Sequence, residues 1–271
     1  AGGPSTSAST RTCSACAVAP SSQFFVPETY VMSDSSKSNA TFPGGYGAPP
    51  PYWDASTAAS RVAVDVARDQ RLVALSPSSA ARAEVLALLA RSAALDEYDV
   101  LLVALVAARG KFDLWCAKRD EMRGRLAASP ATAADGAATR WLWHGAPVAA
   151  VDSILTTGFL RDYSTVAQYG KGTYFARDAE YSLQPQYAAP DDDGAQYLLL
   201  SRVCVGEPCV GRRGMDPPAA KPGSLELHDS MVDDLGNPRI FVLSAGSDNQ
   251  AFAEFVVKLR PKDAESDGGD Y

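Results

Sequence analysis

The sequence predicts an α+β fold in which helices come first and mainly antiparallel strands follow. Helical patterns of apolar residues dominate much of the chain before Thr139. After Thr139 the pattern changes to short runs of β-branched and aromatic residues, separated by turns rich in Gly, Pro and Asp. Helices and strands that segregate along the chain in this way are typical of α+β domains.

The length indicates one large domain with a tail, or two domains, and the composition favours one large domain with a segment at each end. The chain has 271 residues, and 46% of them are apolar, which is enough for a sizeable core. Residues 1–49 are rich in Ser, Ala, Gly and Pro and predict a flexible segment, whereas residues 263–271 predict an acidic, frayed tail. The domain is therefore expected over residues 50–262. Because the chain begins Ala-Gly-Gly-Pro without Met, we expect it to be a piece of a longer protein.

Residues 52–127 are expected to be largely helical after one early strand. The strand is predicted over residues 71–75. A serine just before a helix accepts a hydrogen bond from the first turn, so Ser79 predicts the start of an Ala/Leu-rich helix over about residues 80–94. Apolar residues recur at roughly helical spacing over residues 112–126, which predicts a second, half-buried helix.

The second half of the domain is expected to be mostly strands. An apolar run over residues 100–106 still lies within the helical stretch, and the small, polar residues 127–138 predict the loop that closes it. Helical windows then remain near residues 147–157 and 178–187. Strands are predicted for five runs, 141–143, 173–176, 196–205, 239–244 and 251–259.

Charge and hydropathy argue against two classes of partner. The formal net charge is −7, whereas binding along a phosphate backbone needs clustered Lys and Arg, so nucleic acid is not expected as a partner. No apolar run approaches the ~20 residues that a membrane helix needs, so a membrane is not expected either.

The cysteines favour a reducing compartment and give no metal site. The chain has five, an odd number without the spacing of a disulfide framework, which predicts an intracellular protein, cytoplasmic or nuclear. Cys13 and Cys16 have the first half of a zinc-site spacing, but no nearby second pair or histidine completes it. Cys204 and Cys209 are a conceivable second pair. We nevertheless expect no metal.

Two strand-like runs carry polar groups that a core strand would not choose. His144 interrupts the run Trp141-Leu-Trp-His-Gly145, and Lys171 lies between two glycines in Tyr169-Gly-Lys-Gly-Thr-Tyr-Phe-Ala176. Glycine marks positions where the backbone turns sharply or lets a ligand approach closely. A lone histidine is more often a satisfied core residue, but the two runs in this order predict a ligand site.

The polar groups of these runs suit one kind of ligand. His144 and Tyr174 on neighbouring strands would offer hydrogen bonds to sugar hydroxyls and an aromatic face to a planar ring. Gly145 would leave its backbone open to a flat amide, and Ser182 on the following helix would bond the same amide. Sugar, ring and carboxamide together describe a nicotinamide riboside. Because the chain has neither a Rossmann fingerprint nor a P-loop, NAD would bind as a substrate in a different fold.

The two runs, with Gly158-Phe159 between them, resemble the catalytic domain of the poly(ADP-ribose) polymerase family, the diphtheria-toxin-like ADP-ribosyltransferases. The resemblance covers about residues 50–260 and is specific in its combination of motifs. It implies an ADP-ribosyltransferase fold, with two packed, mainly antiparallel sheets and flanking helices, that uses NAD as a substrate. Further similar segments are 51–54, 114–122, 198–206, 230–233, 238–242 and 250–256.

The resemblance assigns a role to each candidate residue. His144 would bind the adenosine ribose and hold NAD in position. Gly145 and Ser182 would grip the carboxamide. Tyr174 would line the nicotinamide-ribose side and pack near the ring. Arg161 would contact the pyrophosphate from a flexible donor loop through charge-assisted hydrogen bonds.

Two positions depart from the family pattern. The stacking tyrosine usually lies three residues after the serine, where this chain has Pro185, and Tyr187 two residues later is the expected substitute. The residue after His-Gly is commonly Thr or Ser, and here it is Ala146, which removes a hydroxyl that would face the adenosine ribose.

The third position of the family triad predicts the product. Polymer-forming members place a glutamate where this chain has Ile240, and that carboxylate activates the incoming hydroxyl as a general base. Ile240 has no such group, and Glu254 belongs to the following strand motif. The set His144, Tyr174 and Ile240 therefore implies transfer of a single ADP-ribose to a protein acceptor.

Three functions remain open on the sequence. The leading hypothesis is a monomeric, NAD-dependent mono-ADP-ribosyltransferase, an enzyme that modifies a protein. The second is a catalytically silent scaffold module that binds NAD or ADP-ribose, which Ala146, the shifted Tyr187 and the missing glutamate favour. Retention of His144 and Tyr174 favours the enzyme, because silent members often lose them. The third is an NAD glycohydrolase, in which water replaces the acceptor.

Overall fold

A computed structural model describes residues 72–126, 139–160, 168–244 and 247–262, all within one of the two compact units of the chain, residues 31–271. Several predictions fall outside the described residues. These are the flexible segment 1–49, the loop 127–138, the tail 263–271, Cys13, Cys16 and Arg161.

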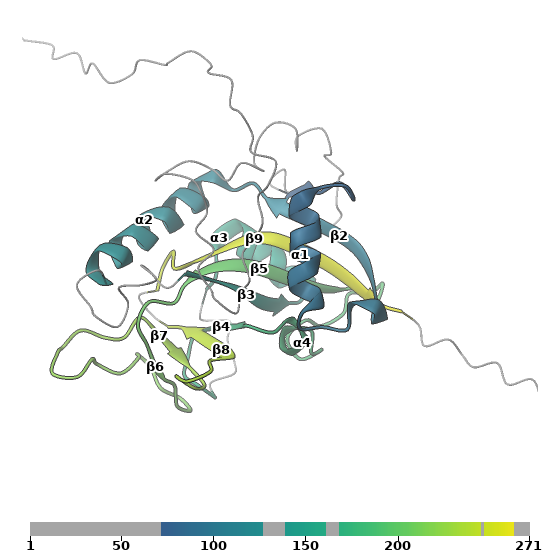
Figure 1. The fold of residues 1–271 in the computed structure, drawn as a ribbon. Helices are drawn as coiled ribbons and strands as arrows, with labels where there is room; N and C mark the ends of the chain where they lie inside the picture. The colour runs from purple at the N-terminus through teal and green to yellow at the C-terminus, as the bar shows by residue number, and fades with distance from the viewer. Residues whose placement is uncertain (1–71, 127–138, 161–167, 245–246, 263–271) are drawn as a thin grey trace, which may run out of the picture. The chain divides into compact units, whose positions relative to one another are not determined.

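A nine-stranded, mostly antiparallel sheet forms the centre of this unit (Figure 1). The strands lie in the order β1-β2-β9-β5-β3-β4-β8-β7-β6, and β6 pairs with β7 in parallel. Their bounds are β1 Leu72–Ala74, β2 Tyr98–Val106, β3 Thr139–Ala146, β4 Thr173–Ala176, β5 Gln196–Cys204, β6 Pro208–Val210, β7 Ser230–Val232, β8 Ile240–Leu243 and β9 Ala251–Pro261. The predicted α+β class is confirmed.

Helices cover both faces of the long strands. The helices are α1 Ala80–Ala90, α2 Arg109–Leu126, α3 Val148–Thr157 and α4 Ala179–Ser182, with a 3₁₀ turn at Leu95–Glu97. On one face, α1 and α4 pack on β2, β5 and β9 through residues such as Val85, Leu198 and Phe255. On the other, α2 and α3 pack on β5 and β9 through residues such as Trp115 and Val256. Successive side chains of β5 and β9 point to opposite faces of the sheet, so each strand contributes residues to both cores.

The sheet is almost divided between β3 and β4. Along its whole length β3 pairs with β5, from Thr139 to Ala146. Toward β4, by contrast, the one aligned pair is Trp143 with Ala176. The four strands from β4 to β6 therefore form a second half-sheet joined to the first by a narrow seam. Beyond this pair β3 and β4 are not aligned, and the site described below lies at this seam.

The helical part of the prediction is right for two helices and wrong for one segment. Ser79 caps α1 by accepting a hydrogen bond from the Arg82 N–H at 3.4 Å, as predicted, and α2 contains the predicted helix. The expectation of a largely helical stretch is wrong for residues 98–106, which form β2. Its last residues, from Val103, are buried between β1 and β9. A strand buried on both faces shows no alternation, so periodicity could not distinguish it from a buried helix.

The strands of the second half fall where the sequence predicts them, with two additions. Short strands β6 and β7 were not expected, because three residues carry too little pattern to recognise. The helical window 178–187 yields only the four residues of α4, and Pro185 follows soon after. Within the described part of the chain, none of the helices has the length and apolar character to cross a membrane.

Candidate active site

A cavity of about 600 Å³ opens where β3 and β4 separate. Its walls come from both halves of the sheet, from α3 with the segment after it, and from the turn after α4. The lining residues are His144 to Pro147, Ala149, Ala150, Ser153, Ile154, Gly158 to Leu160, Thr173, Tyr174, Gln186 and Tyr187. Of the predicted site residues, His144, Gly145, Tyr174 and Tyr187 meet here.

His144 bridges the two halves of the sheet. Its Nδ1 lies 2.7 Å from the Tyr174 carbonyl oxygen, and because a carbonyl can only accept, Nδ1 carries the proton and donates. Burial lowers the pKa of the His144 imidazole, which keeps the ring neutral. The rings of Phe159 and Phe175 pack against it at centroid distances of 5.2 and 5.5 Å. Nε2 of the neutral ring is then an acceptor, suited to a sugar hydroxyl.

Gly145 is required by packing rather than by a turn. A Cβ at this position would lie 2.0 Å from the Ser182 carbonyl oxygen. The absence of a side chain therefore lets β3 approach the backbone of α4. Ser182 is buried and is not among the residues that line the cavity, so the structure brings it to Gly145 through its backbone. Its predicted bond to a carboxamide stays a prediction.

Tyr174 lines the cavity from β4, and its hydroxyl holds the glycine-rich loop in place. The hydroxyl donates to the Gly170 carbonyl at 2.6 Å and accepts from the Tyr169 N–H at 3.1 Å. Gly170 has a φ of 113°, and a Cβ on Gly172 would lie 2.1 Å from the Leu243 carbonyl oxygen. The two glycines flanking Lys171 thus serve a tight turn and close strand packing.

Tyr187 lies at the other side of the cavity, in a pair with Tyr181. Their rings are stacked, with centroids 5.1 Å apart and planes inclined by 26°. Their hydroxyls are 2.7 Å apart, within hydrogen-bonding distance. Burial and the Tyr187 hydroxyl together raise the pKa of Tyr181. Tyr181 is not among the site residues predicted from the sequence, and its spacing from Tyr187 offers no recognisable signal.

Ile240 is buried at the start of β8, beside the cavity rather than in its lining. It pairs with Ala176, and Tyr174 pairs with Val242, so the side chains of Ile240 and Tyr174 lie on the same face of the half-sheet. Both belong to one apolar cluster with Met231. The position therefore offers hydrocarbon, and no carboxylate, next to Tyr174.

Glu254, the other carboxylate that the sequence analysis considered, is buried in the core. It forms a two-pronged ion pair with Arg202, whose Nη2 donates to Oε1 at 2.9 Å and whose Nε donates to Oε2. The guanidinium carbon lies 4.9 Å from the ring centroid of Trp141 and 5.5 Å from that of Trp115. Glu254 does not line the cavity, which agrees with its assignment to a structural strand.

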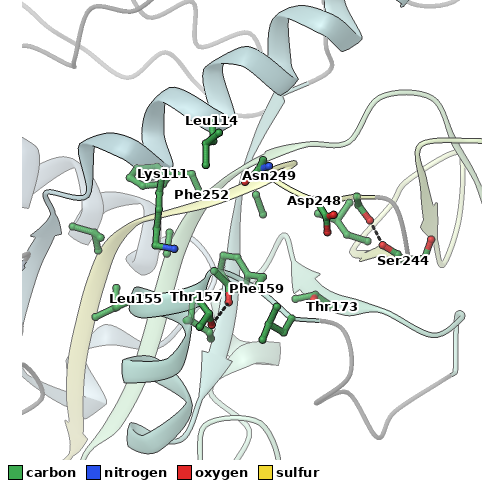
Figure 2. Close-up of a pocket in the computed structure, with 18 residues that line it drawn as sticks. Lys111, Leu114, Leu155, Thr157, Phe159, Thr173, Ser244, Asp248, Asn249 and Phe252 are labelled. Atoms are coloured by element: carbon green, nitrogen blue, oxygen red, sulfur yellow. Dashed lines mark hydrogen bonds between the residues drawn. The ribbon is translucent and has the colours of Figure 1, made fainter.

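A second cavity of about 520 Å³ shares Phe159 with the first in its lining (Figure 2). Figure 2 shows Lys111 and Leu114 of α2 on one side of it, and Thr157, Phe159 and Thr173 on the other. The segment before β9 contributes further polar side chains. None of the predicted site residues that the structure describes lines this second cavity. The predicted chemistry thus belongs to the first cavity.

No metal-binding group is evident in the part of the chain that the structure describes. It contains no cluster of three or more His, Cys, Asp or Glu side chains arranged to hold an ion. Cys204 and Cys209 are buried free thiols.

Comparison with known proteins identifies the domain. Residues 90–223 match the family model of the poly(ADP-ribose) polymerase catalytic domain. The human protein mono-ADP-ribosyltransferase PARP14 is 34% identical over 123 residues, which cover 44% of this chain and 7% of that protein. Two further protein mono-ADP-ribosyltransferases, mouse PARP10 and human PARP12, are each 36% identical to this chain. Each match covers 44% of this chain, and the matches cover 12% of PARP10 and 17% of PARP12.

The chain thus spans less than a fifth of each of these three relatives. Mouse PARP11, also named a protein mono-ADP-ribosyltransferase, is 33% identical over 139 residues, or 40% of its own length. The resemblance read from residues 141–145 and 169–176 is confirmed by these matches. Residues 90–223 of the chain are thus similar to the catalytic domain of the poly(ADP-ribose) polymerases.

Proposed function

We propose that this domain is a mono-ADP-ribosyltransferase, which transfers one ADP-ribose from NAD to a protein acceptor and releases nicotinamide. The observation that carries the proposal is the meeting of His144, Gly145, Tyr174 and Tyr187 in one cavity at the seam of the sheet. The names of four relatives as protein mono-ADP-ribosyltransferases support the same activity.

The cavity suits an extended dinucleotide substrate. Its volume of about 600 Å³ lies within the usual range of small-molecule sites, and its walls combine rings with a few polar groups. In this proposal the nicotinamide ring lies between Tyr174 and Tyr187. A hydroxyl of the adenosine ribose would donate to Nε2 of the neutral His144, since Nδ1 is bonded to the Tyr174 carbonyl. Arg161, which lies outside the described residues, would contact the pyrophosphate.

The chemistry proposed for this site needs no base from the protein. The bond between the ribose C1 and the nicotinamide nitrogen breaks, and its electron pair neutralises the departing ring. The remaining ribosyl group has oxocarbenium character, and an ionised carboxylate of the acceptor bonds to C1; a neutral nucleophile would also have to release its proton to solvent. His144 would hold the adenosine ribose and Tyr174 would pack against the nicotinamide ribose, so that C1 is oriented for this attack.

Transfer is proposed to stop after one unit because of Ile240. Elongation requires a base to deprotonate the hydroxyl of an ADP-ribose already attached. Ile240 and Val242 present only hydrocarbon beside Tyr174, and both are buried. An acceptor carboxylate, by contrast, is already ionised near neutral pH and needs no such help.

One observation favours the alternative of a silent scaffold that binds NAD or ADP-ribose. Ala146 lines the cavity, and a hydroxyl is common at this position in the family, so one hydrogen bond toward the adenosine ribose is missing. A net hydrogen bond is worth about 0.5–1.5 kcal/mol, or roughly a 2- to 10-fold change in affinity. That loss weakens binding more readily than it abolishes turnover, so we retain the enzyme as the main proposal.

Labelled NAD separates these functions. The domain is incubated with NAD carrying the label in its adenylate half, and protein label, free ADP-ribose and nicotinamide are measured. We expect one covalent ADP-ribose per modified site with equal release of nicotinamide, and loss of both in His144→Ala and Tyr174→Ala. Tyr98→Phe, which removes a half-buried hydroxyl on β2 outside the cavity, is the matched control.

Each other outcome contradicts a stated part of the proposal. Long polymer would refute the role of Ile240. Free ADP-ribose without labelled protein would indicate a glycohydrolase, and binding of NAD without turnover would indicate the scaffold. Protein label that persists unchanged in Tyr174→Ala would refute the assignment of this cavity as the active site.

We further propose that the domain acts as a monomer inside the cell, in the cytoplasm or nucleus. Three free cysteines, Cys116, Cys204 and Cys209, are buried among the described residues, which is compatible with a reducing compartment. Gel filtration with light scattering tests the monomer, and imaging of the full-length protein in its own cells tests the compartment.

A further inference from the structure

The strongest unassigned feature near the cavity is Tyr181. Its ring stacks on Tyr187, and the two hydroxyls lie 2.7 Å apart. Tyr187 lines the cavity, whereas Tyr181 does not. Tyr181 therefore supports one face of the Tyr187 ring, and Tyr187 contributes to the lining of the cavity.

Tyr181 is carried by an element that is fixed to two others. Ser92, just after α1, accepts from the Ala179 N–H through its hydroxyl at 2.8 Å, and its carbonyl accepts from the Glu180 N–H at 3.1 Å. At the end of α4, the Ser182 carbonyl abuts Gly145 of β3. The base of Tyr181 is thus anchored to the first half of the sheet and to the end of α1.

The ring of Tyr181 extends from this anchor to the second half-sheet. It packs against the apolar cluster that contains Ile240 and Met231, on the same face as Tyr174. Tyr187, by contrast, lies in a turn after α4, at the end of a stretch that includes Pro185. A half-buried ring on a turn has several rotamers available unless a neighbour restricts them.

We propose that Tyr181 is a positioning residue for the donor, which holds the Tyr187 ring in the orientation that receives nicotinamide. This inference rests on the proposed function. The ring stack fixes the plane of Tyr187, and the bond between the hydroxyls fixes its tilt. A pre-oriented ring loses less conformational freedom when a ligand binds, which increases affinity without a new contact to the ligand.

The role also explains how this chain tolerates its unusual tyrosine position. The family pattern places the stacking tyrosine three residues after the serine, and this chain has Pro185 there. Tyr187 lies two residues further along, in the turn, where α4 no longer orients it. Tyr181 supplies from α4 the orientation that the turn by itself does not give.

A double-mutant cycle with nicotinamide as the probe tests this role. The variants are Tyr181→Phe, Tyr187→Phe and the double variant, each of which removes the same hydroxyl contact and keeps both rings. Binding of nicotinamide is measured by titration calorimetry or NMR, and steady-state kinetics with NAD gives KM and kcat. Tyr98→Phe is again the control for loss of a distant hydroxyl.

If the two hydroxyls act as one unit, all three variants weaken nicotinamide binding by the same factor, about 2- to 10-fold. KM for NAD should rise by a similar factor while kcat changes little, because the contact serves binding in the ground and transition states alike. Tyr181→Leu, which also removes the stack, should weaken binding further. Thermal unfolding should be measured for each variant.

The outcomes separate this inference from the proposed function. Unchanged binding in Tyr181→Phe and Tyr181→Leu, with normal binding by the wild type, overturns the positioning role alone. Additive effects of the two hydroxyl removals also overturn it, because they show that the hydroxyls act independently. Absence of nicotinamide and NAD binding by the wild type overturns the proposed function and this inference with it.

Discussion

At the scale of single residues, the close approach of β3 to α4 depends on Gly145. A Cβ there would lie 2.0 Å from the Ser182 carbonyl oxygen, a distance that only a backbone shift can relieve. Because Ser182 belongs to the same helix as Tyr181, such a shift would also move Tyr181, on which the cavity-lining Tyr187 stacks.

Gly145→Ala should therefore destabilise the domain by about 1–3 kcal/mol, as overpacking of a well-packed site does. Chemical denaturation measures the change. Gly124→Ala is the matched control, since Gly124 lies in α2 and a Cβ there would meet no neighbouring atom within 4 Å, so alanine should stabilise by up to about 1 kcal/mol. Equal stability of Gly145→Ala and the wild type would refute the close contact.

A second prediction at this scale concerns the protonation of His144. Burial lowers its pKa in the folded state below the ordinary value of 6.5. Between these two pKa values the unfolded chain binds a proton that the folded chain does not, so stability falls as the pH decreases below about 6.5. Above that pH the imidazole is neutral in both states, and it contributes no pH dependence.

NMR titration of the His144 ring should give a midpoint below 6.5. The free energy of unfolding of the wild type, measured relative to His144→Gln, should fall as the pH drops through this range. A midpoint above 6.5 would contradict the burial of the ring in a neutral form.

At the scale of elements, α2 is joined to β5 and β9 around a buried ion pair. Arg202 of β5 and Glu254 of β9 are 4% and 0% exposed, and the guanidinium lies against rings of α2 and β3. Charges removed from water this completely are stable only while paired. The pair thus fixes the register of two central strands against the helix.

Glu254→Gln should destabilise the domain by about 3–5 kcal/mol, because it leaves the Arg202 charge buried without its counter-charge. Glu121→Gln is the control, since Glu121 pairs with Lys118 on the exposed surface of α2, and its loss should cost at most about 0.5 kcal/mol. Urea unfolding of both variants checks the contrast. Similar stabilities would show that the buried pair contributes no more than a surface pair.

At the scale of the whole molecule, the site depends on the seam between the two half-sheets. β3 supplies His144 and Gly145, while β4 and β8 supply Tyr174 and Ile240. Because β3 and β4 share one aligned residue pair, the cavity can open beside that pair, while an apolar cluster that includes Leu142 and Phe175 still joins the two halves. The product predicted for this fold is therefore set by the second half, where Ile240 lies.

Ile240→Glu should not convert the domain into a polymerase. Ile240 is 5% exposed in an apolar cluster, so a carboxylate there would be neutral or strongly destabilising, by at least about 3 kcal/mol. Ile240→Val should cost only about 0.5–1.5 kcal/mol. Product length on gels and thermal unfolding check both, and long polymer from a stable Ile240→Glu variant would contradict this account.

The sequence by itself determined the α+β class, the positions of most strands and the family, because local patterns and motif residues such as His144 and Tyr174 are written along the chain. It misjudged residues 98–106, because the residues from 100 to 106 are all apolar and the sequence there shows no alternation, although the burial of the first residues of β2 does alternate. It left open whether the glycines of 169–176 serve a sharp turn or ligand approach, and the structure places Gly170 in a turn and Gly172 against the backbone of Leu243.

Only the tertiary structure decided which groups share a cavity. The seam at Trp143 and Ala176, the contact of Gly145 with Ser182, and the pairing of Tyr181 with Tyr187 join residues through space. Such contacts depend on how strands far apart in sequence pack, and no local pattern encodes them. The sequence therefore indicated which residues and which reaction to expect, and the packing of the two half-sheets determined which of those residues lie together in one cavity.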